Sequence, residues 1–362
     1  MNNLQTHLAD CIRLNGPMSI ARFMAEALGH PEWGYYISRD PLGRAGDFIT
    51  APEVSQMFGE LIGLWCADRW QALGAPDPFN FVELGPGRGT LMADALRAAA
   101  AMPGFSRAAH IHLVETSPVL RAAQQRALAN KEVAWHDHIA DLPAGPTIAV
   151  ANEFFDALPI RQFQRKDDGW HERMVALRGE QLCLQLNPAV VPSAPLPKAV
   201  QAAPSDAIFE VSPARSAAMS ELSQHLLGHG GAGLIIDYGH GHSAPGDTLQ
   251  AMRAHEYVDP LAHPGQADLT AHVDFQALVE AASGAVTHGP AGQGAFLKQL
   301  GIATRAEILQ RRATAAQREA ITAALHRLTG QDQMGQLFKV MAVTSPGQTA
   351  PPGFALPGFE ET

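Results

Sequence analysis

The stretch FNFVELGPGRGTLMADALRA, which begins at Phe79, constrains the fold of this chain more than any other. A short apolar run reaches an acidic residue, Glu83. Three glycines follow at alternate positions, Gly85, Gly87 and Gly89, and a helical pattern resumes after them. Glycine at such a junction lets the backbone turn sharply and approach a ligand, and the start of the helix offers free N–H groups. The stretch predicts a strand, a ligand-binding turn and a helix, with a tight turn that binds nothing as the alternative.

The residues around the glycines distinguish three kinds of ligand. A dinucleotide fingerprint would have glycine where this chain has Thr90, and a phosphate-binding loop would end in Gly-Lys-Ser or Gly-Lys-Thr, which the stretch lacks. The carboxylate of Glu83 would repel phosphate and attract a cation. S-adenosylmethionine carries a sulfonium and an ammonium group. The stretch therefore favours S-adenosylmethionine as the cofactor, with Glu83, the three glycines and their backbone N–H groups around it.

The pattern around this stretch alternates between strands and helices. Short β-rich runs occur at residues 79–85, 110–116, 132–137 and 146–155. Helical patterns separate the first three runs, and the alternation returns with a helix at 214–231 and strands at 232–239 and 336–345. This order predicts an α/β fold with a mostly parallel, doubly wound sheet and helices on both faces.

Changes in pattern divide the chain into parts. We expect a helical N-terminal cap with a cofactor-covering loop, a sheet domain in two segments, an antiparallel insertion with an Asp-Gly turn at Asp168, and a flexible tail. In that order, the parts are residues 1–76, 77–158 with 214–345, 159–213, and 346–362. Within the insertion, the proline- and alanine-rich residues 188–206 are expected to form an exposed connector.

The N-terminal part contains two helical patterns, at residues 18–30 and 52–73. Ser19 is placed to cap the first. The second is expected to bury a stripe of apolar residues: Met57, Leu61, Leu64, Trp65 and Ala67. Between the helices, Asp47 and Phe48 belong to a loop expected to close over the cofactor, with a glycine-bounded turn as an equal alternative.

Polar residues also stand at the ends of the other expected strands. Glu115 ends the second strand, where an acid can accept both hydroxyls of an adenosine ribose, or can stabilise the start of the next helix. Asn152, Glu153 and Asp156 follow the fourth strand, where ligands of open α/β sheets bind. Asn152 is expected at the cofactor. The alternative makes Asn152 a turn former and Asp156 a surface charge.

From about Gly16 to Ser345, the chain resembles the MidA-like class I methyltransferases. Seven segments carry the resemblance, in this order: GDFITAPEVSQMFGELIGLW, VELGPGRGTLMADALR, HLVETSPVLRAAQ, ANEFFDALPIRQF, LIIDYGH, DLTAHVDFQAL and GQGAFLKQLGI. The resemblance implies a Rossmann-like, seven-stranded, mostly parallel sheet with a helical N-terminal extension and an inserted α+β segment. It places Gly85, Gly87 and Glu115 at the family's cofactor positions. The family includes a mitochondrial arginine methyltransferase that serves assembly of respiratory complex I, so it implies an arginine-bearing partner protein as substrate.

Methyl transfer to arginine needs carboxylates, because a guanidinium begins protonated and is gripped by paired acids. Glu153 and Asp156 are the first catalytic candidates. Asp237, with Tyr238 beside it, provides the second, since its strand also ends at the ligand-binding edge. Two other functions stay open: a non-catalytic assembly factor that binds the same cofactor, and a methyltransferase that acts on a small molecule.

Composition narrows the partners further. The net charge of −10, from 26 basic and 36 acidic residues, argues against a nucleic-acid surface. Cys11, Cys66 and Cys183 are too far apart to indicate a disulfide framework or a zinc motif, and the His240–His242 pair matches no metal motif. No metal is therefore expected. No apolar run has the length of a membrane span, and no leader is recognisable, so a cytoplasmic location is expected. A homodimer is compatible with the sequence.

Overall fold

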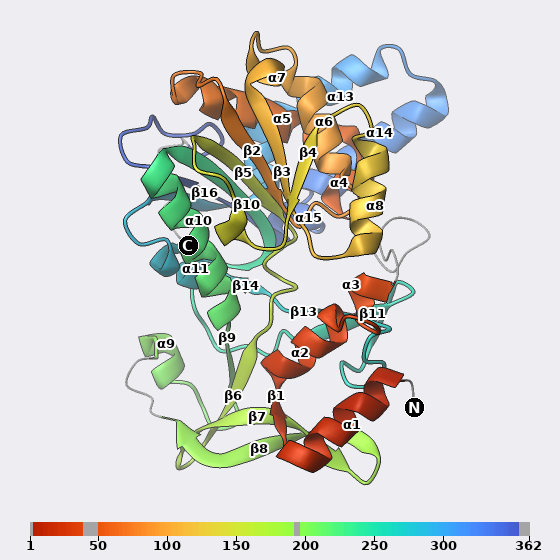
Figure 1. Ribbon diagram of the computed structural model, residues 1–362, viewed down its shortest axis with the longest axis vertical. Coiled ribbons are helices and arrows are strands. Elements are labelled where there is room, and N and C mark those ends of the chain that lie inside the picture. Colours follow the sequence, from red (N-terminus) through yellow and green to blue (C-terminus); the bar gives the residue numbers. More distant parts are fainter. Residues whose placement is uncertain (1–2, 39–49, 192–195, 355–362) are drawn as a thin grey trace.

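The glycine stretch lies within a large central sheet (Figure 1). The structure is a computed structural model that describes residues 3–38, 50–191 and 196–354. Within these residues, the order of strands in the sheet is β15-β16-β10-β5-β2-β3-β4, and β14 pairs with β10 beside this path. The strands are β2 (Phe79–Leu84), β3 (Ala109–Val114), β4 (Val133–His136), β5 (Thr147–Asn152), β10 (Gly231–His240), β14 (Val273–Asp274), β15 (Val286–Gly292) and β16 (Phe338–Thr344).

Most of this sheet is parallel. Strands β10, β5, β2, β3 and β4 pair in parallel, whereas β16 runs antiparallel to both β10 and β15. The expected α/β class with a mostly parallel sheet of seven strands is confirmed, and the two-residue β14 adds an eighth strand.

Helices cover both faces of the sheet because its strands are apolar on both sides. Neighbouring residues of β2 belong to different cores: Phe81 packs in one cluster with residues of α5 and α6, and Val82 packs in another with residues of α10 and α11. The helices are α1 (Asn3–Asn15), α2 (Ile20–Gly29), α3 (Tyr35–Ser38), α4 (Ala51–Val54), α5 (Gln56–Ala72), α6 (Thr90–Ala99), α7 (Phe105–Ala108), α8 (Pro118–Ala127), α9 (Lys198–Gln201), α10 (Pro213–His229), α11 (Phe275–Ala281), α12 (Gln293–Gln299), α13 (Ile302–Gln310), α14 (Ala315–Thr329) and α15 (Met334–Leu337).

The N-terminal segment and the insertion share a second, antiparallel sheet. Strand β1 pairs with β7, so that Met18 lies opposite Val175, and the order is β1-β7-β6-β9 with β8 paired to β7. Its strands are β1 (Met18–Ser19), β6 (Arg161–Lys166), β7 (Gly169–Arg178), β8 (Gln181–Val191) and β9 (Ile208–Val211). A small third sheet contains β11 (Gln250–Arg253), β12 (Glu256–Val258) and β13 (Asp268–Thr270).

Helix α2 joins this second sheet to the rest of the N-terminal segment. The Ser19 hydroxyl accepts a hydrogen bond from the Arg22 N–H, 3.2 Å away, which confirms the expected cap. Phe23 and Leu28 of α2 pack in one cluster with Val175 of β7 and Leu269 of β13. The N-terminal helices are therefore fixed to strands that lie much later in the chain.

Three local expectations were wrong. Leu64 is 48% exposed, because α5 is buried on nearly every other side and no single apolar stripe marks its exposed face. Residues 188–206 are not simply an exposed connector, since β8 continues to Val191 and α9 buries Val200. Within the predicted tail, the Pro352 carbonyl accepts a hydrogen bond from the Trp65 indole and Phe354 contacts Phe296, so the chain is packed there.

Candidate active site

A cavity of about 440 Å³ lies at the carboxyl ends of β2, β3 and β5. Residues of α2, among them Met24 and Leu28, form its opposite wall. Among the charged side chains of the described residues that line it, acidic ones predominate. Seven carboxylates face a single arginine, Arg88: Glu53, Glu83, Glu115, Asp137, Glu153, Asp156 and Glu221. A cavity with this balance of charge favours cationic ligands.

The glycine turn forms one edge of the cavity. Gly85, Gly87 and Gly89 have φ angles of +63°, +52° and +82°, a backbone conformation that other residues rarely adopt. A Cβ atom on Gly85 would also lie 2.9 Å from a ring carbon of Phe154. Gly85 and Gly87 line the cavity, whereas Gly89 precedes the first residue of α6. The backbone conformation of the turn therefore requires glycine. The cavity beside the turn leaves room for a ligand.

Glu83 is the penultimate residue of β2 and is 2% exposed. One of its carboxylate oxygens has no hydrogen-bond partner among the described residues, although the backbone N–H of Met92 is directed at the carboxylate. Burial, with a smaller contribution from Glu115, raises the pKa of Glu83 to about 8. A buried carboxylate with an unpartnered oxygen fits a positively charged ligand, because a cation compensates both the burial and the missing hydrogen bond.

Glu115 lines the same cavity and is held by two donors. Its carboxylate accepts hydrogen bonds from the Ser117 N–H at 2.8 Å and the Gln124 amide at 3.1 Å. The Gln124 amide also donates to the Gly87 carbonyl at 2.8 Å. Burial raises the pKa of Glu115, and these hydrogen bonds oppose that effect.

Gln124 thus connects the glycine turn to Glu115, a role that the sequence analysis missed. The Trp135 indole donates to the Gln124 carbonyl oxygen at 2.8 Å, so both ends of the amide are used. Its signal in the sequence was a glutamine on the buried face of a helix, next to Ala123 and one turn after Leu120. A buried amide at such a position needs partners and often connects functional segments.

The chain leaves β5 through a strained residue. Glu153 has φ of +51°, which is uncommon for a residue other than glycine and is stabilised only by surrounding contacts. Its carboxylate accepts hydrogen bonds from the Ala51 N–H at 3.0 Å and the Asn152 amide at 3.1 Å. Burial, and then the charge of Asp156, raises the pKa of Glu153 to about 7. Asn152, Glu153 and Asp156 all line the cavity.

Asp237 occupies a different position from the other acidic candidates. Its carboxylate accepts hydrogen bonds from the backbone N–H groups of Phe155, Asp156 and Tyr238, at 3.0, 3.1 and 3.0 Å. It is fully buried and is not among the described residues that line the cavity. Burial raises the pKa of Asp237 well above its usual range, and the nearby Asp156 adds to the effect. Its contacts fix the loop that carries Asp156.

Arg215 of α10 supports the same loop from the other side. Its guanidinium donates to four backbone carbonyls: those of Phe155 at 2.7 Å, Asp156 at 3.0 Å, Ala271 at 2.8 Å and His272 at 2.6 Å. The side chain is buried, which lowers the pKa of Arg215, while the charge of Asp237 opposes that effect. The sequence analysis missed this residue, because an arginine in a helical pattern usually indicates an exposed face.

A second cavity lies apart from this site. Asp274 caps α11 by accepting the Ala277 N–H at 3.1 Å. His272 and Asp274 line a second cavity of about 460 Å³, and His240 lines it as well. The predicted cofactor residues Asp47 and Phe48 lie outside the described residues.

Comparisons with known proteins agree with this geometry. Residues 61–291 match a family model described as "Putative S-adenosyl-L-methionine-dependent methyltransferase". The chain is 36% identical to the protein arginine methyltransferase NDUFAF7, mitochondrial, of Danio rerio, with 95% of this chain and 87% of the relative covered. It is also 36% identical to the human protein of that name, with coverage of 93% and 82%.

A solved structure provides a ligand-bound counterpart. The protein from Burkholderia thailandensis that holds S-adenosyl-homocysteine superposes with a TM-score of 0.85 and 28% identity, over 97% of this chain and 93% of the other. S-adenosyl-homocysteine is what S-adenosylmethionine becomes when it loses its methyl group. The cofactor expected from the sequence is thereby confirmed.

The expected location is contradicted by these comparisons. The relatives are named as mitochondrial proteins, whereas the sequence analysis expected a cytoplasmic one. That expectation rested on the lack of a recognisable leader, and such an absence does not by itself indicate a location. Among the described residues, no helix is both long and apolar enough to cross a membrane.

Proposed function

The chain belongs to this family of S-adenosylmethionine-dependent methyltransferases, and we propose that it methylates an arginine side chain of a partner protein. The observation that carries the proposal is the acidic lining of the cavity, where the described residues supply seven acidic side chains and one arginine. The sulfonium of the cofactor and the guanidinium of the acceptor are both cations. The names of the mitochondrial relatives, which are arginine methyltransferases, support the same acceptor.

We assign the cofactor to the glycine side of the cavity. Gly85 and Gly87 let the backbone approach it, and Glu83 faces its positively charged methionine part. Glu115 accepts hydrogen bonds from the ribose hydroxyls, in the manner of acids at the end of a second strand. Asn152 contributes its amide from the end of β5, where its side-chain oxygen has no hydrogen-bond partner among the described residues. Asp137 and His138 also line the cavity and would lie near the adenine.

We assign the acceptor to Glu153 and Asp156. The bound cofactor supplies an electrophilic methyl group. An arginine guanidinium is protonated at neutral pH, and one of its nitrogens must lose a proton as it accepts the methyl group. Glu153, whose pKa burial raises to about 7, can accept that proton. Asp156 stays beside it to hold the remaining N–H groups. Asp237 acts through the loop it fixes and is a positioning residue.

The proposal extends to the partner. By family resemblance, the first candidate substrate is a subunit of a respiratory complex I-type assembly, and the enzyme takes part in that assembly. A homodimer is compatible with this activity, and sedimentation velocity at several protein concentrations would measure the oligomeric state directly.

The test uses S-adenosylmethionine labelled in its methyl group. The purified protein is added to a lysate of cells that lack its gene, so that acceptor arginines are unmodified. Protein and small molecules are separated, and the labelled protein is hydrolysed to amino acids. Label in methylarginine is the expected result, and the Glu153→Gln variant, which has the same shape without the charge, should leave the protein fraction nearly unlabelled.

Two outcomes would contradict the proposal. Label that enters only small molecules would identify a small-molecule methyltransferase. Binding of S-adenosylmethionine by calorimetry, with no label transferred to any fraction, would identify a non-catalytic assembly factor.

A further inference from the structure

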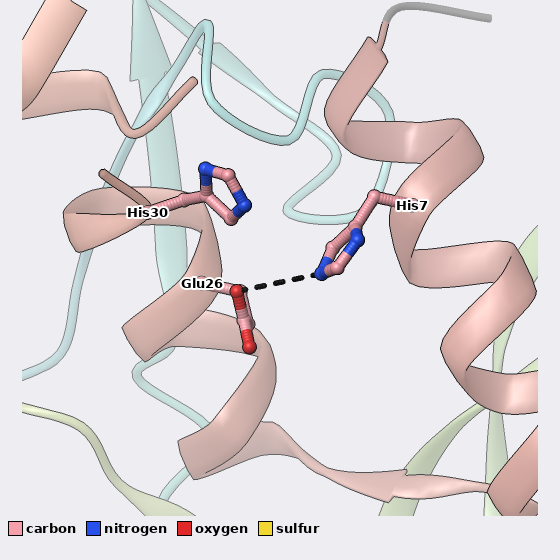
Figure 2. A group of neighbouring side chains, drawn as sticks. All are labelled: His7, Glu26 and His30. Atoms are coloured by element: carbon pink, nitrogen blue, oxygen red, sulfur yellow. Dashed lines mark ion pairs between the residues drawn. The ribbon is translucent and has the colours of Figure 1, made fainter. Parts of the chain in front are cut away.

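We propose that His7, Cys11, Glu26 and His30 form a zinc site between helices α1 and α2. His7 lies on α1, whereas Glu26 lies on the last turns of α2 and His30 directly follows that helix. The three side chains of His7, Glu26 and His30 point toward one another from two separate segments (Figure 2). None of the four residues lines the methyl-transfer cavity. The site is therefore separate from the proposed methyl transfer.

The distances suit a tetrahedral metal. One ligand atom each from His7, Glu26 and His30 lies within 4.8 Å of the others. His7 Nε2 is 3.8 Å from Glu26 Oε2. Around tetrahedral zinc, with bonds of about 2.1 Å to nitrogen and oxygen, two such ligands stand about 3.4 Å apart. Small rotations of the His7 and Glu26 side chains would bring these two atoms to that separation, because both side chains are partly exposed.

Cys11 can supply the fourth donor after its side chain moves, because its Sγ atom is near His7 but does not lie within 4.8 Å of all three other ligand atoms. Its Sγ atom lies 3.6 Å from His7 Nε2, one helical turn along α1. For a zinc–sulfur bond of about 2.3 Å, the expected separation of sulfur and nitrogen around tetrahedral zinc is about 3.6 Å. Two imidazoles, a carboxylate and a thiolate are ligands that zinc prefers, whereas Ca²⁺ and Mg²⁺ prefer oxygen alone.

The sequence analysis missed this group because the ligands come in two pairs. His7 and Cys11 are four residues apart, as are Glu26 and His30, so each pair lies on one side of its segment. Only the packing of α1 against α2 brings the pairs together. A search for closely spaced cysteines or histidines therefore found no zinc motif.

The hydrogen bonds of His30 define the change that zinc would cause. Its Nδ1 accepts hydrogen bonds from the backbone N–H groups of Glu32 and Trp33, each at 3.2 Å. This leaves Nε2 for the metal. Binding through Nε2 puts the ring proton on Nδ1, so these two N–H groups must turn toward water. The His30 ring also stacks on the Trp33 ring, with centroids 4.6 Å apart, so zinc binding should change the fluorescence of Trp33.

The alternative is an ordinary ion pair between His7 and Glu26, beside His30 at the end of α2. Such a pair would require no third or fourth ligand and no selectivity among metals. The chain offers a matched control in His326, whose Nε2 lies 3.4 Å from Asp332 Oδ1 in a histidine–carboxylate pair. The two histidine–carboxylate pairs resemble each other, but the zinc proposal predicts that only the pair of His7 and Glu26 binds zinc.

The test measures zinc binding by tag-free, reduced protein. Calorimetry should give one zinc ion per chain, with no comparable heat for Mg²⁺ or Ca²⁺, and the melting temperature should rise with zinc because the metal binds the folded state. Glu26→Gln and Cys11→Ser should each weaken zinc binding at least about tenfold, the effect of losing even an outer partner of a metal ligand. His326→Ala should leave the affinity unchanged.

A fluorescence titration gives a second readout. Zinc should change the emission of the wild-type protein and leave that of a Trp33→Phe variant nearly unchanged, although the variant still binds zinc by calorimetry. Absence of zinc binding by the wild type, or equal affinity in Glu26→Gln and His326→Ala, would overturn the site. Unchanged affinity in Cys11→Ser would remove Cys11 from it. None of these measurements depends on methyl transfer.

Discussion

The carboxylate of Asp237 accepts a hydrogen bond from the backbone N–H of Asp156 at 3.1 Å, across 81 residues of sequence. These two acids, the first and second catalytic candidates predicted from the sequence, therefore differ in position. Asp156 lines the cavity, whereas Asp237 lies beneath the loop that carries it. Since Arg215 holds the carbonyls of the same loop, the position of Asp156 is fixed from both its donor and its acceptor side.

Replacing Asp237 with asparagine should therefore reduce both stability and turnover. The amide group of the introduced side chain would face one of the backbone N–H groups that the carboxylate now accepts, so a buried donor would lose its partner. The expected loss is about 1–3 kcal/mol in the free energy of unfolding. It is measured by urea denaturation, together with kcat and KM for the cofactor. A fall in kcat with unchanged stability would instead indicate that Asp237 touches the substrate.

Glu83 predicts a pH dependence of cofactor binding. Its pKa is about 8 in the protein, and a bound sulfonium would lower that pKa because the cation stabilises the carboxylate. Binding then releases a proton below pH 8, so the affinity for S-adenosylmethionine should rise with pH and level off above about pH 8. The slope should not exceed about tenfold per pH unit for one group. Calorimetry between pH 6 and 9 measures it.

Two controls isolate the role of Glu83. The Glu83→Gln variant should bind S-adenosylmethionine more weakly and with a shallower pH dependence; the part that remains comes from Glu153, whose pKa is about 7. S-adenosylhomocysteine lacks the sulfonium charge, and its affinity for the wild type should vary less with pH. Identical pH profiles for the two ligands would show that Glu83 does not face the sulfonium.

Glu153 predicts a pH dependence of turnover. If its carboxylate accepts a proton from the acceptor, the unprotonated form is the active one, and kcat should rise as pH increases through about 7. The Glu153→Gln variant should lose this rise and lower kcat by about 10²- to 10⁴-fold, the usual contribution of a general base. A variant with wild-type kcat would exclude Glu153 as the base.

Much of the fold could be predicted because the central strands carry strong local signals. The runs at 79–85 and 110–116 are short and β-rich, and Glu83 and Glu115 lie near their carboxyl ends, so the two runs indicate strands and a ligand-binding edge together. The second sheet had no such signal. Its pairing of Met18 with Val175 involves a two-residue strand, which is too short to produce any recognisable period.

In the candidate site, the acids at the ends of strands could be predicted, whereas the residues that hold them in place could not. Acids at the ends of strands are visible in a single sequence, so Glu153 and Asp156 were found. Gln124 and Arg215 lie within helical patterns, and their partners are backbone carbonyls or side chains from other elements. Tertiary packing alone decides which polar residue of a helix is buried, and the contacts of Gln124 and Arg215 depend on that packing.

The packing of α5 on α6 gives a prediction about stability alone. A Cβ atom added to Gly63 of α5 would lie 2.3 Å from the Ala95 carbonyl oxygen of α6, so the two helix backbones touch at this glycine. Alanine favours a helix over glycine by up to about 1 kcal/mol, but forcing apart a packed interface costs about 1–3 kcal/mol, and more where the contact is backbone. Gly63→Ala should therefore lower the free energy of unfolding.

Gly228 in α10 is the matched control, because its added Cβ would meet no atom within 4 Å, and Gly228→Ala should be neutral or stabilising by up to about 1 kcal/mol. Urea denaturation of both variants measures the difference, and equal stability for the two would mean that α5 and α6 can separate without cost.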